Sequence, residues 1–209
     1  MRFFRLSSLF GMVLLAIVIS GCASAPSIPP GAELVKQPAQ RFDDAGFSIV
    51  PPPGDGWYGM RIGGMITFGK VFSPTHTFVA SIAVVRMQQQ YKTPEDFLHF
   101  VEQAKSKTTD SSRFTMLLSN FALDTRLAPD CVKYHRRAAD HGLPDASGKT
   151  LILDVFGIAC LHPDDPHRAV DMEYSERSVS GNLTSSVYAE GEAFLSSLQF
   201  VPLEKKSNG

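Results

Sequence analysis

The sequence predicts one α+β domain in which an antiparallel β-sheet is flanked by helices, and three observations lead to this fold class. Two segments rich in β-branched and aromatic residues, 65–72 and 78–87, are joined by a Ser-Pro-Thr turn and are typical of a hairpin. Segment 131–177 consists of three apolar stretches separated by two turns, which indicates an antiparallel meander. Helical spacing of apolar residues is clear in two places, 93–104 and 185–198.

Length and charge limit the classes of function. The chain has 209 residues, of which 44% are hydrophobic and 20% charged, so it can bury one core. Residues 1–21 contain two arginines and no acid, so the 188 residues that follow hold 18 Lys and Arg against 21 Asp and Glu. A mildly acidic domain is not expected to be a nucleic-acid binder of the usual cationic kind.

The elements follow one another in a simple order. Residues 47–50 predict a short strand that three prolines stop, and Gly54-Asp-Gly56 then predicts a turn before Trp57. After the hairpin, Thr93 is the expected N-cap of a helix that starts at Pro94 and has acids in its first turn. Residues 114–123 predict another strand, and a helix over 185–198 ends the domain.

The N-terminal segment predicts the cellular address. Basic residues in 1–5 and an apolar run over 9–19 indicate a secretory signal, because the run is shorter than the ~20 residues of a membrane span. Ile19-Ser-Gly-Cys22 resembles a bacterial lipobox. The resemblance implies cleavage before Cys22 and attachment of acyl chains such as palmitate to this cysteine. Ala23 after it resembles the sorting pattern of outer-membrane lipoproteins. An uncleaved N-terminal helix with an unrelated cysteine is the alternative.

The chain therefore divides into four parts. We expect a signal peptide over 1–21, a lipidated tether rich in Pro, Ala and Ser over 22–40, a single periplasmic domain over 41–202 and a disordered tail over 203–209.

Two cysteines remain in a chain that is bound for an oxidising compartment, which favours one disulfide. The turn after residue 141 gives antiparallel partners whose numbers add to 291, so Cys131 faces Cys160 and Arg137 faces Asp154. The next turn predicts a sum of 329, which places Ala159 opposite Val170. This register gives one mainly small or apolar face across three strands. Two buried free thiols are the alternative to the disulfide.

The element order and the stretch Gly46-Phe-Ser-Ile-Val-Pro-Pro-Pro-Gly-Asp-Gly-Trp57 resemble the PsbP-like fold, shared by the PsbP proteins of photosystems and the Mog proteins. The resemblance implies a three-layer α/β/α sandwich over residues 41–202. It also implies non-enzymatic accessory or assembly proteins that act through their surfaces, without a cofactor.

Candidate sites are few. Trp57 and Tyr58, between glycines, are the best candidates for an exposed aromatic site for a partner, with a core-capping tryptophan as the alternative. His135 and Arg137 belong to a small basic patch with Lys133, Arg136 and Lys149. The turn from His162 to His167 carries two histidines and two aspartates that could hold a divalent ion, although prolines and aspartates are also what a turn requires.

The interpretation is an outer-membrane lipoprotein, anchored by lipid on the periplasmic side, whose domain is a non-enzymatic binding or assembly module of the envelope. Its expected partners are the membrane and an envelope protein, and no catalytic or metal site is assigned. The alternatives are a metal-assisted envelope hydrolase that uses the turn from His162 to His167 and a purely structural envelope protein without a ligand. Serine-hydrolase, phosphate-loop and zinc-helix motifs do not occur in the sequence.

Overall fold

The computed structural model describes residues 28–107, 109–142, 150–179 and 184–203. The predicted signal peptide, Cys22 and nearly all of the predicted tail lie outside these residues. The strands are β1 (Glu33–Leu34), β2 (Phe42–Asp44), β3 (Phe47–Ile49), β4 (Tyr58–Ile62), β5 (Met65–Ser73), β6 (His76–Arg86), β7 (Phe114–Leu123), β8 (Cys131–Asp140), β9 (Leu151–His162), β10 (Asp165–Ser178) and β11 (Gln199–Phe200), and the helices are α1 (Pro94–Lys107) and α2 (Ser185–Ser196).

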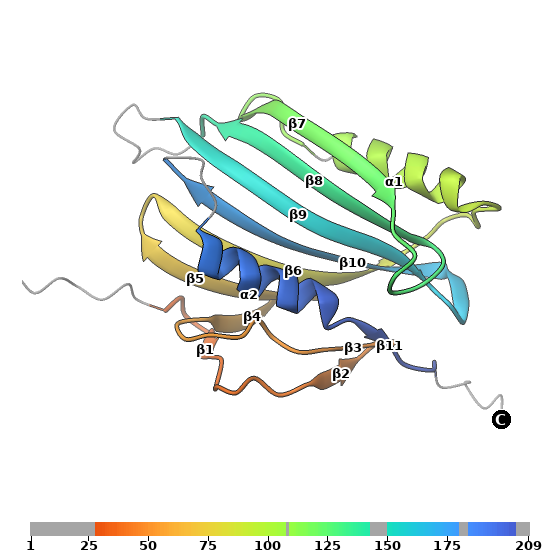
Figure 1. Cartoon of the computed structure of the whole chain (residues 1–209), viewed down its shortest axis with the longest axis horizontal. Coiled ribbons are helices and arrows are strands. Elements are labelled where there is room, and N and C mark those ends of the chain that lie inside the picture. The colour runs from red at the N-terminus through yellow and green to blue at the C-terminus, as the bar shows by residue number, and fades with distance from the viewer. Residues whose placement is uncertain (1–27, 108, 143–149, 180–183, 204–209) are drawn as a thin grey trace, which may run out of the picture.

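Antiparallel strands dominate the structure. The described residues form an eight-stranded sheet of order β1-β4-β5-β6-β10-β9-β8-β7 and a three-stranded sheet of order β11-β3-β2. Figure 1 shows α2 lying across the long sheet, with α1 beside β7 and β8 and the small sheet next to α2. The α+β class with an antiparallel sheet and helices is therefore confirmed.

Alternate residues of the long strands separate into two hydrophobic clusters, one on each face of the sheet. Val132 and Ala159 belong to the cluster that includes Phe97 of α1. Cys131 and Cys160, their neighbours in sequence, belong to the larger cluster that includes Phe194 of α2 and side chains of the small sheet. The period of two along a strand thus assigns one helix to each face. We call these the α1 face and the α2 face.

Both helices form for the reasons that the sequence indicates. The Thr93 hydroxyl accepts a hydrogen bond of 3.1 Å from the backbone N–H of Asp96, as an N-cap does. Phe97 and Val101 are the buried residues of α1, at helical spacing. In α2 the buried residues Val187, Phe194 and Leu195 form the predicted apolar side.

The predicted register of β8 with β9 is confirmed. Cys131 pairs with Cys160, Arg137 with Asp154, and every pair between these two strands follows the same sum. A disulfide joins Cys131 to Cys160 across the two strands. Both cysteines are fully buried in the cluster of the α2 face.

The predicted register of β9 with β10 is wrong by one residue. Ala159 pairs with Asp171 rather than with Val170, which lies opposite Cys160. An irregularity between Asp165 and Ala169 inserts extra residues into β10 before regular pairing begins. Because side chains alternate, this shift turns Val170, Met172 and Tyr174 to the α2 face and places Asp171, Glu173 and Ser175 under α1. The α1 face is thus not uniformly apolar.

The fold also begins earlier than the predicted boundary at Arg41. Glu33–Leu34 pairs with β4, and the amide of Gln37 donates a 2.8 Å hydrogen bond to the carbonyl of Gly54. Residues 33–37 therefore belong to the domain and not to a free tether. No helix within the described ranges is long and apolar enough to cross a membrane.

The disulfide closes a loop between residues 29 apart in sequence. Replacing both Cys131 and Cys160 by Ala should therefore lower the free energy of unfolding by roughly 3–4 kcal/mol, because the unfolded chain loses a constraint. Urea denaturation of the double variant beside the unreduced parent measures the difference. Alkylation of the parent without reductant should leave both thiols unlabelled, and labelling of both would contradict the disulfide.

Candidate functional site

A cluster of charged and polar side chains lies beneath the last turn of α1. Lys105 Nζ is 2.7 Å from Asp171 Oδ2 and 3.1 Å from Glu173 Oε2. The Tyr134 hydroxyl oxygen lies 2.8 Å from Asp171 Oδ1 and 3.0 Å from Glu173 Oε2, so its single proton is shared between the two carboxylates. The same ammonium lies 4.6 Å from the centre of the Tyr134 ring. One cation and one phenol therefore hold two adjacent carboxylates on the α1 face.

Burial and charge shift the pKa values of this cluster. Burial is the largest cause that raises the pKa of Asp171 above 3.8, against the opposing effect of Lys105. Burial also raises the pKa of Tyr134 well above 10.0, and the two carboxylates add to this. For Lys105, burial alone would lower the pKa, but Asp171 and Glu173 together raise it above 10.5. Lys105 is thus a fixed positive charge at neutral pH.

A glycine creates the space that Tyr134 needs. Gly157 pairs with Tyr134 across β8 and β9, and a Cβ atom at this glycine would collide with the phenol ring. The bare backbone lets the ring lie flat on the sheet, with its hydroxyl directed at β10. The same arrangement of tyrosine over glycine recurs at Tyr58 with Gly69.

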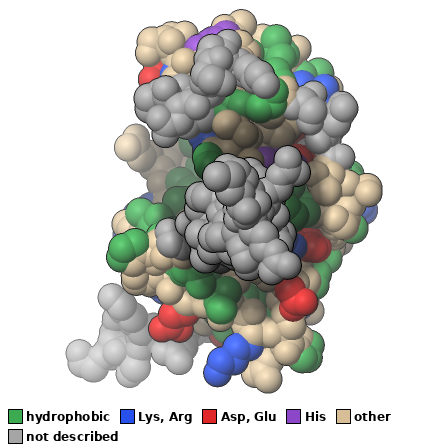
Figure 2. Space-filling model, turned by 90° about the vertical axis from the view of Figure 1, so that its left-hand side faces the viewer, with side chains coloured by type: hydrophobic (Ala, Val, Ile, Leu, Met, Phe, Trp, Pro, Cys, Tyr) green, Lys and Arg blue, Asp and Glu red, His purple; other side chains and the backbone are tan. Residues whose placement is uncertain are grey.

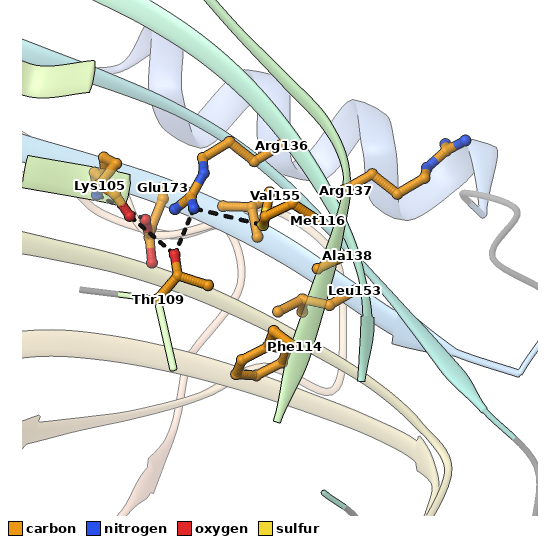
Figure 3. Close-up of a pocket in the computed structure, with 10 residues that line it drawn as sticks. All are labelled: Lys105, Thr109, Phe114, Met116, Arg136, Arg137, Ala138, Leu153, Val155 and Glu173. Carbon is orange, nitrogen blue, oxygen red and sulfur yellow. Dashed lines mark hydrogen bonds and ion pairs between the residues drawn. The ribbon is translucent and has the colours of Figure 1, made fainter. Parts of the chain in front are cut away.

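A pocket of about 220 Å³ opens beside this cluster, where α1 ends and the sheet is no longer covered. Its lining consists of Lys105, Thr109, Phe114, Met116, Arg136, Arg137, Ala138, Leu153, Val155 and Glu173. Figure 3 shows the polar groups of Lys105, Thr109, Arg136 and Glu173 together at one end, with Phe114, Ala138 and Leu153 at the other. The floor is made by alternate residues of β7, β8 and β9.

Arg136 is the central polar group of the pocket. Its Nη2 donates to the Thr109 hydroxyl at 2.5 Å and contacts the sulfur of Met116 at 3.6 Å. Its Nε is buried and makes no hydrogen bond within the described part of the chain. Burial lowers the pKa of Arg136, against the attraction of Glu173. A guanidinium that is partly desolvated and short of acceptors is prepared to bind an acceptor from outside.

Of the predicted basic patch, His135 lies on the α2 face, whereas Arg137 lines the pocket but turns its guanidinium away from it. Arg137 Nε donates to Asp154 Oδ1 at 2.6 Å on the α2 face, and Figure 3 shows its guanidinium pointing away from the other labelled groups. His135 stacks on Phe156, with 4.0 Å between the ring centres, and its Nε2 lies 3.3 Å from the same Asp154. The patch is thus divided between two faces, and Lys149 lies outside the described residues.

Trp57 is not the exposed aromatic residue that the sequence favoured. Its side chain is only 1% exposed, and its indole N–H donates to Glu190 of α2 at 2.6 Å. Lys70 bonds the same carboxylate at 2.8 Å, so the indole caps the core beneath α2. Tyr58 packs over Gly69 and is partly buried. The alternative of a core-capping tryptophan is the one that the structure supports.

The histidines of the predicted metal loop do not converge. His162 is 2% exposed and directs Nε2 to the carbonyls of Gly46 and Val201, while its Nδ1 accepts the backbone N–H of Asp164. His167 lies on the exposed side, with Nε2 3.0 Å from the amide of Gln90. Within the described ranges, no group of three or more His, Cys, Asp and Glu side chains is placed to hold a metal ion.

Some of the pocket residues carry a sequence signal that the interpretation above missed. Lys105 follows Val101 by four positions, so helical spacing places it at the edge of the apolar stripe of α1. Asp171 and Glu173 alternate with apolar residues in β10, and either face of such a strand could have been the buried one. For Thr109, which lies beyond the end of α1, no pattern in the sequence indicates a role.

Comparison with known proteins gives structural neighbours but no family. No protein-family model and no curated protein matches the chain. The solution structure of cyanobacterial PsbP (CyanoP) from Synechocystis sp. PCC 6803 is similar with a TM-score of 0.42 and 11% identity, and covers 86% of this chain and 99% of that one. A crystal structure from Bacteroides thetaiotaomicron VPI-5482 is similar with a TM-score of 0.40 and 12% identity, and the match covers 80% of this chain and 50% of that one. A PsbP-like protein is thus among the structural neighbours.

Removing the cation of this partly buried cluster should destabilise the fold. Lys105→Met leaves Asp171 and Glu173 without their ion pair, and because the side chains are partly exposed we expect a loss of about 1–3 kcal/mol in the free energy of unfolding at neutral pH. Urea denaturation measures it, and Lys107→Met, an exposed change in the same turn, should stay within about 0.5 kcal/mol.

The free energy of unfolding that is lost in Lys105→Met should depend on pH, and the direction of this dependence follows from Asp171. Because the folded-state pKa of Asp171 is raised above 3.8, its charged form destabilises the fold at neutral pH, and that effect disappears as the pH falls through the folded-state pKa. The difference between Lys105→Met and the parent should therefore shrink on acidification. A difference that is constant or grows would show that this carboxyl does not respond to Lys105.

Proposed function

We propose that the chain is a lipid-anchored lipoprotein of the outer membrane whose periplasmic domain, a PsbP-like α/β/α sandwich, is a non-enzymatic binding or assembly module. The lipobox-like sequence that ends in Cys22 supports the anchor. The two helices on opposite faces of the long sheet support the sandwich. The pocket beside the end of α1 carries the proposal of a binding function, because it combines an apolar floor with a polar end.

The make-up of the pocket supports binding rather than catalysis. Lys105 forms an ion pair with Glu173, and the hydroxyl of Tyr134 hydrogen-bonds to the carboxylate of Glu173. Apolar walls with a few fixed polar groups are the usual construction of a ligand site. The pocket is smaller than the ~300–1,000 Å³ that is typical of sites for drug-sized ligands. We therefore expect it to hold a small ligand or one end of a larger one.

The metal-assisted hydrolase remains the other hypothesis, but no geometric observation favours it. Both nitrogens of the His162 ring already bond backbone groups, and its ring is buried between the turn and the C-terminal segment. A metal ion at this place would require the ring to leave Gly46 and Val201. The binding hypothesis needs no such rearrangement.

Filling the pocket should abolish binding. The full chain, purified from the fraction in which it resides, should carry a small-molecule adduct in native mass spectrometry. Val155→Phe places a larger ring on the pocket floor and should remove this adduct, whereas Val84→Phe, at an exposed position of β6, should keep it. An adduct unaffected by Val155→Phe, or no adduct and no crosslinked partner dependent on the pocket, would contradict the proposal.

The anchor is tested separately. Cys22→Ser removes the thiol to which lipid would be attached, so the protein should move from the outer-membrane fraction to the soluble periplasmic fraction. Sucrose-gradient fractionation with immunoblotting measures the distribution, and Ser20→Ala, a small-to-small change before the cysteine, should leave it unchanged. A Cys22→Ser chain that stays in the membrane fraction after signal removal would contradict the anchor.

A further inference from the structure

We propose that the pocket beside α1 binds an aliphatic monocarboxylate, with the carboxylate on the guanidinium of Arg136 and the chain over the apolar floor. This inference rests on the proposed binding function and names the class of ligand. It follows from three features of the pocket: a guanidinium whose Nε has no acceptor within the described residues, the partial compensation of the acids near it, and the direction of the floor.

The first feature is that Arg136 forms no ion pair with a carboxylate among the residues that the structure describes. Two other arginines near this end of the sheet, Arg113 and Arg177, both reach Asp140, at 2.8 and 3.7 Å. Arg136 instead has a hydroxyl, a thioether and a buried Nε without an acceptor. A planar carboxylate can accept two parallel hydrogen bonds from a guanidinium, which makes it the acceptor with the best geometric match.

The second feature is the compensation of the nearby acids. Glu173 lines the pocket and would repel an anion, but its Oε2 is held by Lys105 and by the hydroxyl of Tyr134. Asp171 lies beyond it and bonds the same two groups. Lys105 thus offsets one of the two negative charges at the polar end. Arg136 is the second cation of this end, and its Nε has no acceptor within the described part of the chain, so an added carboxylate would meet it there.

The third feature is the direction of the apolar floor. Ala138 lies two residues along β8 from Arg136 on the same face, with Leu153 and Val155 beside them on β9 and Phe114 on β7. Two residues of strand extend about 7 Å, so the floor continues from the guanidinium for the length of a short alkyl chain. Figure 2 shows hydrophobic side chains exposed among charged ones at the end of the molecule that it presents. Met116, which is 38% exposed, forms the lip of the pocket.

The contributions of the ligand's carboxylate and of its alkyl chain can be tested separately. The full chain in lipid nanodiscs is titrated calorimetrically with octanoate, with octanol as the uncharged analogue and acetate as the headgroup alone, and empty nanodiscs are subtracted. Octanoate should bind with one site per chain and more tightly than either analogue. Arg136→Gln should weaken the affinity for octanoate by about tenfold to a hundredfold, because it removes a charge-assisted hydrogen bond. Arg61→Gln on β4 is the matched control, since this exposed guanidinium pairs with Asp44 and lies outside the lining of the pocket.

A second pair of variants does not depend on the stability of the Arg136 variant. Met116→Glu places a negative charge at the lip of the pocket and should also weaken the binding of octanoate. Leu117→Glu changes an exposed neighbour outside the lining and should leave the binding of octanoate unchanged. Equal binding of octanol and octanoate, or no effect of either Arg136→Gln or Met116→Glu, would overturn the inference. A pocket-dependent adduct that is neutral or cationic would overturn it as well, while leaving the proposed binding function in place.

Discussion

The pairing register of β10 within the sheet determines what lies on each face of the protein. β10 contacts β9 on one side and β6 on the other, so it joins the two halves of the sheet. In this register Val170, Met172 and Tyr174 enter the larger core beneath α2. Asp171 and Glu173 consequently face α1. A shift by one residue would bury two carboxylates under α2, where the surroundings are apolar, so the core itself enforces the register.

The chemistry of the α1 face follows from that register. Two carboxylates on a covered face require a cation and hydrogen-bond donors, and Lys105 and Tyr134 supply them. Lys105 reaches them from the last turn of α1. The pocket that Arg136 lines lies beside this turn, so the partly buried ionic cluster and the pocket both follow from one arrangement.

The sequence was sufficient where local rules govern the structure and insufficient where tertiary packing decides. The hairpin of β5 and β6, the capped start of α1 and the β8–β9 register depend on turn chemistry and periodicity, and all three were predictable. The register after His162 was not, because a β-bulge adds residues without a sequence signature. The burial of Trp57 depends on Glu190, which is distant in sequence. Glu173 was assigned to the wrong face because of the register error, since the predicted register turns Tyr174 rather than Glu173 to the face that carries Arg136.

The topology also relates the pocket to the proposed anchor. β1 and β7 are the opposite edges of the long sheet, and the pocket floor starts on β7. Seven strand spacings of about 4.8 Å place these edges about 34 Å apart. If Cys22 carries the proposed lipid, the ten residues between Cys22 and Glu33 would keep the β1 edge within about 35 Å of the membrane. Because this tether is about as long as the sheet is wide, the pocket of such a lipoprotein could face either the bilayer or the surrounding solution.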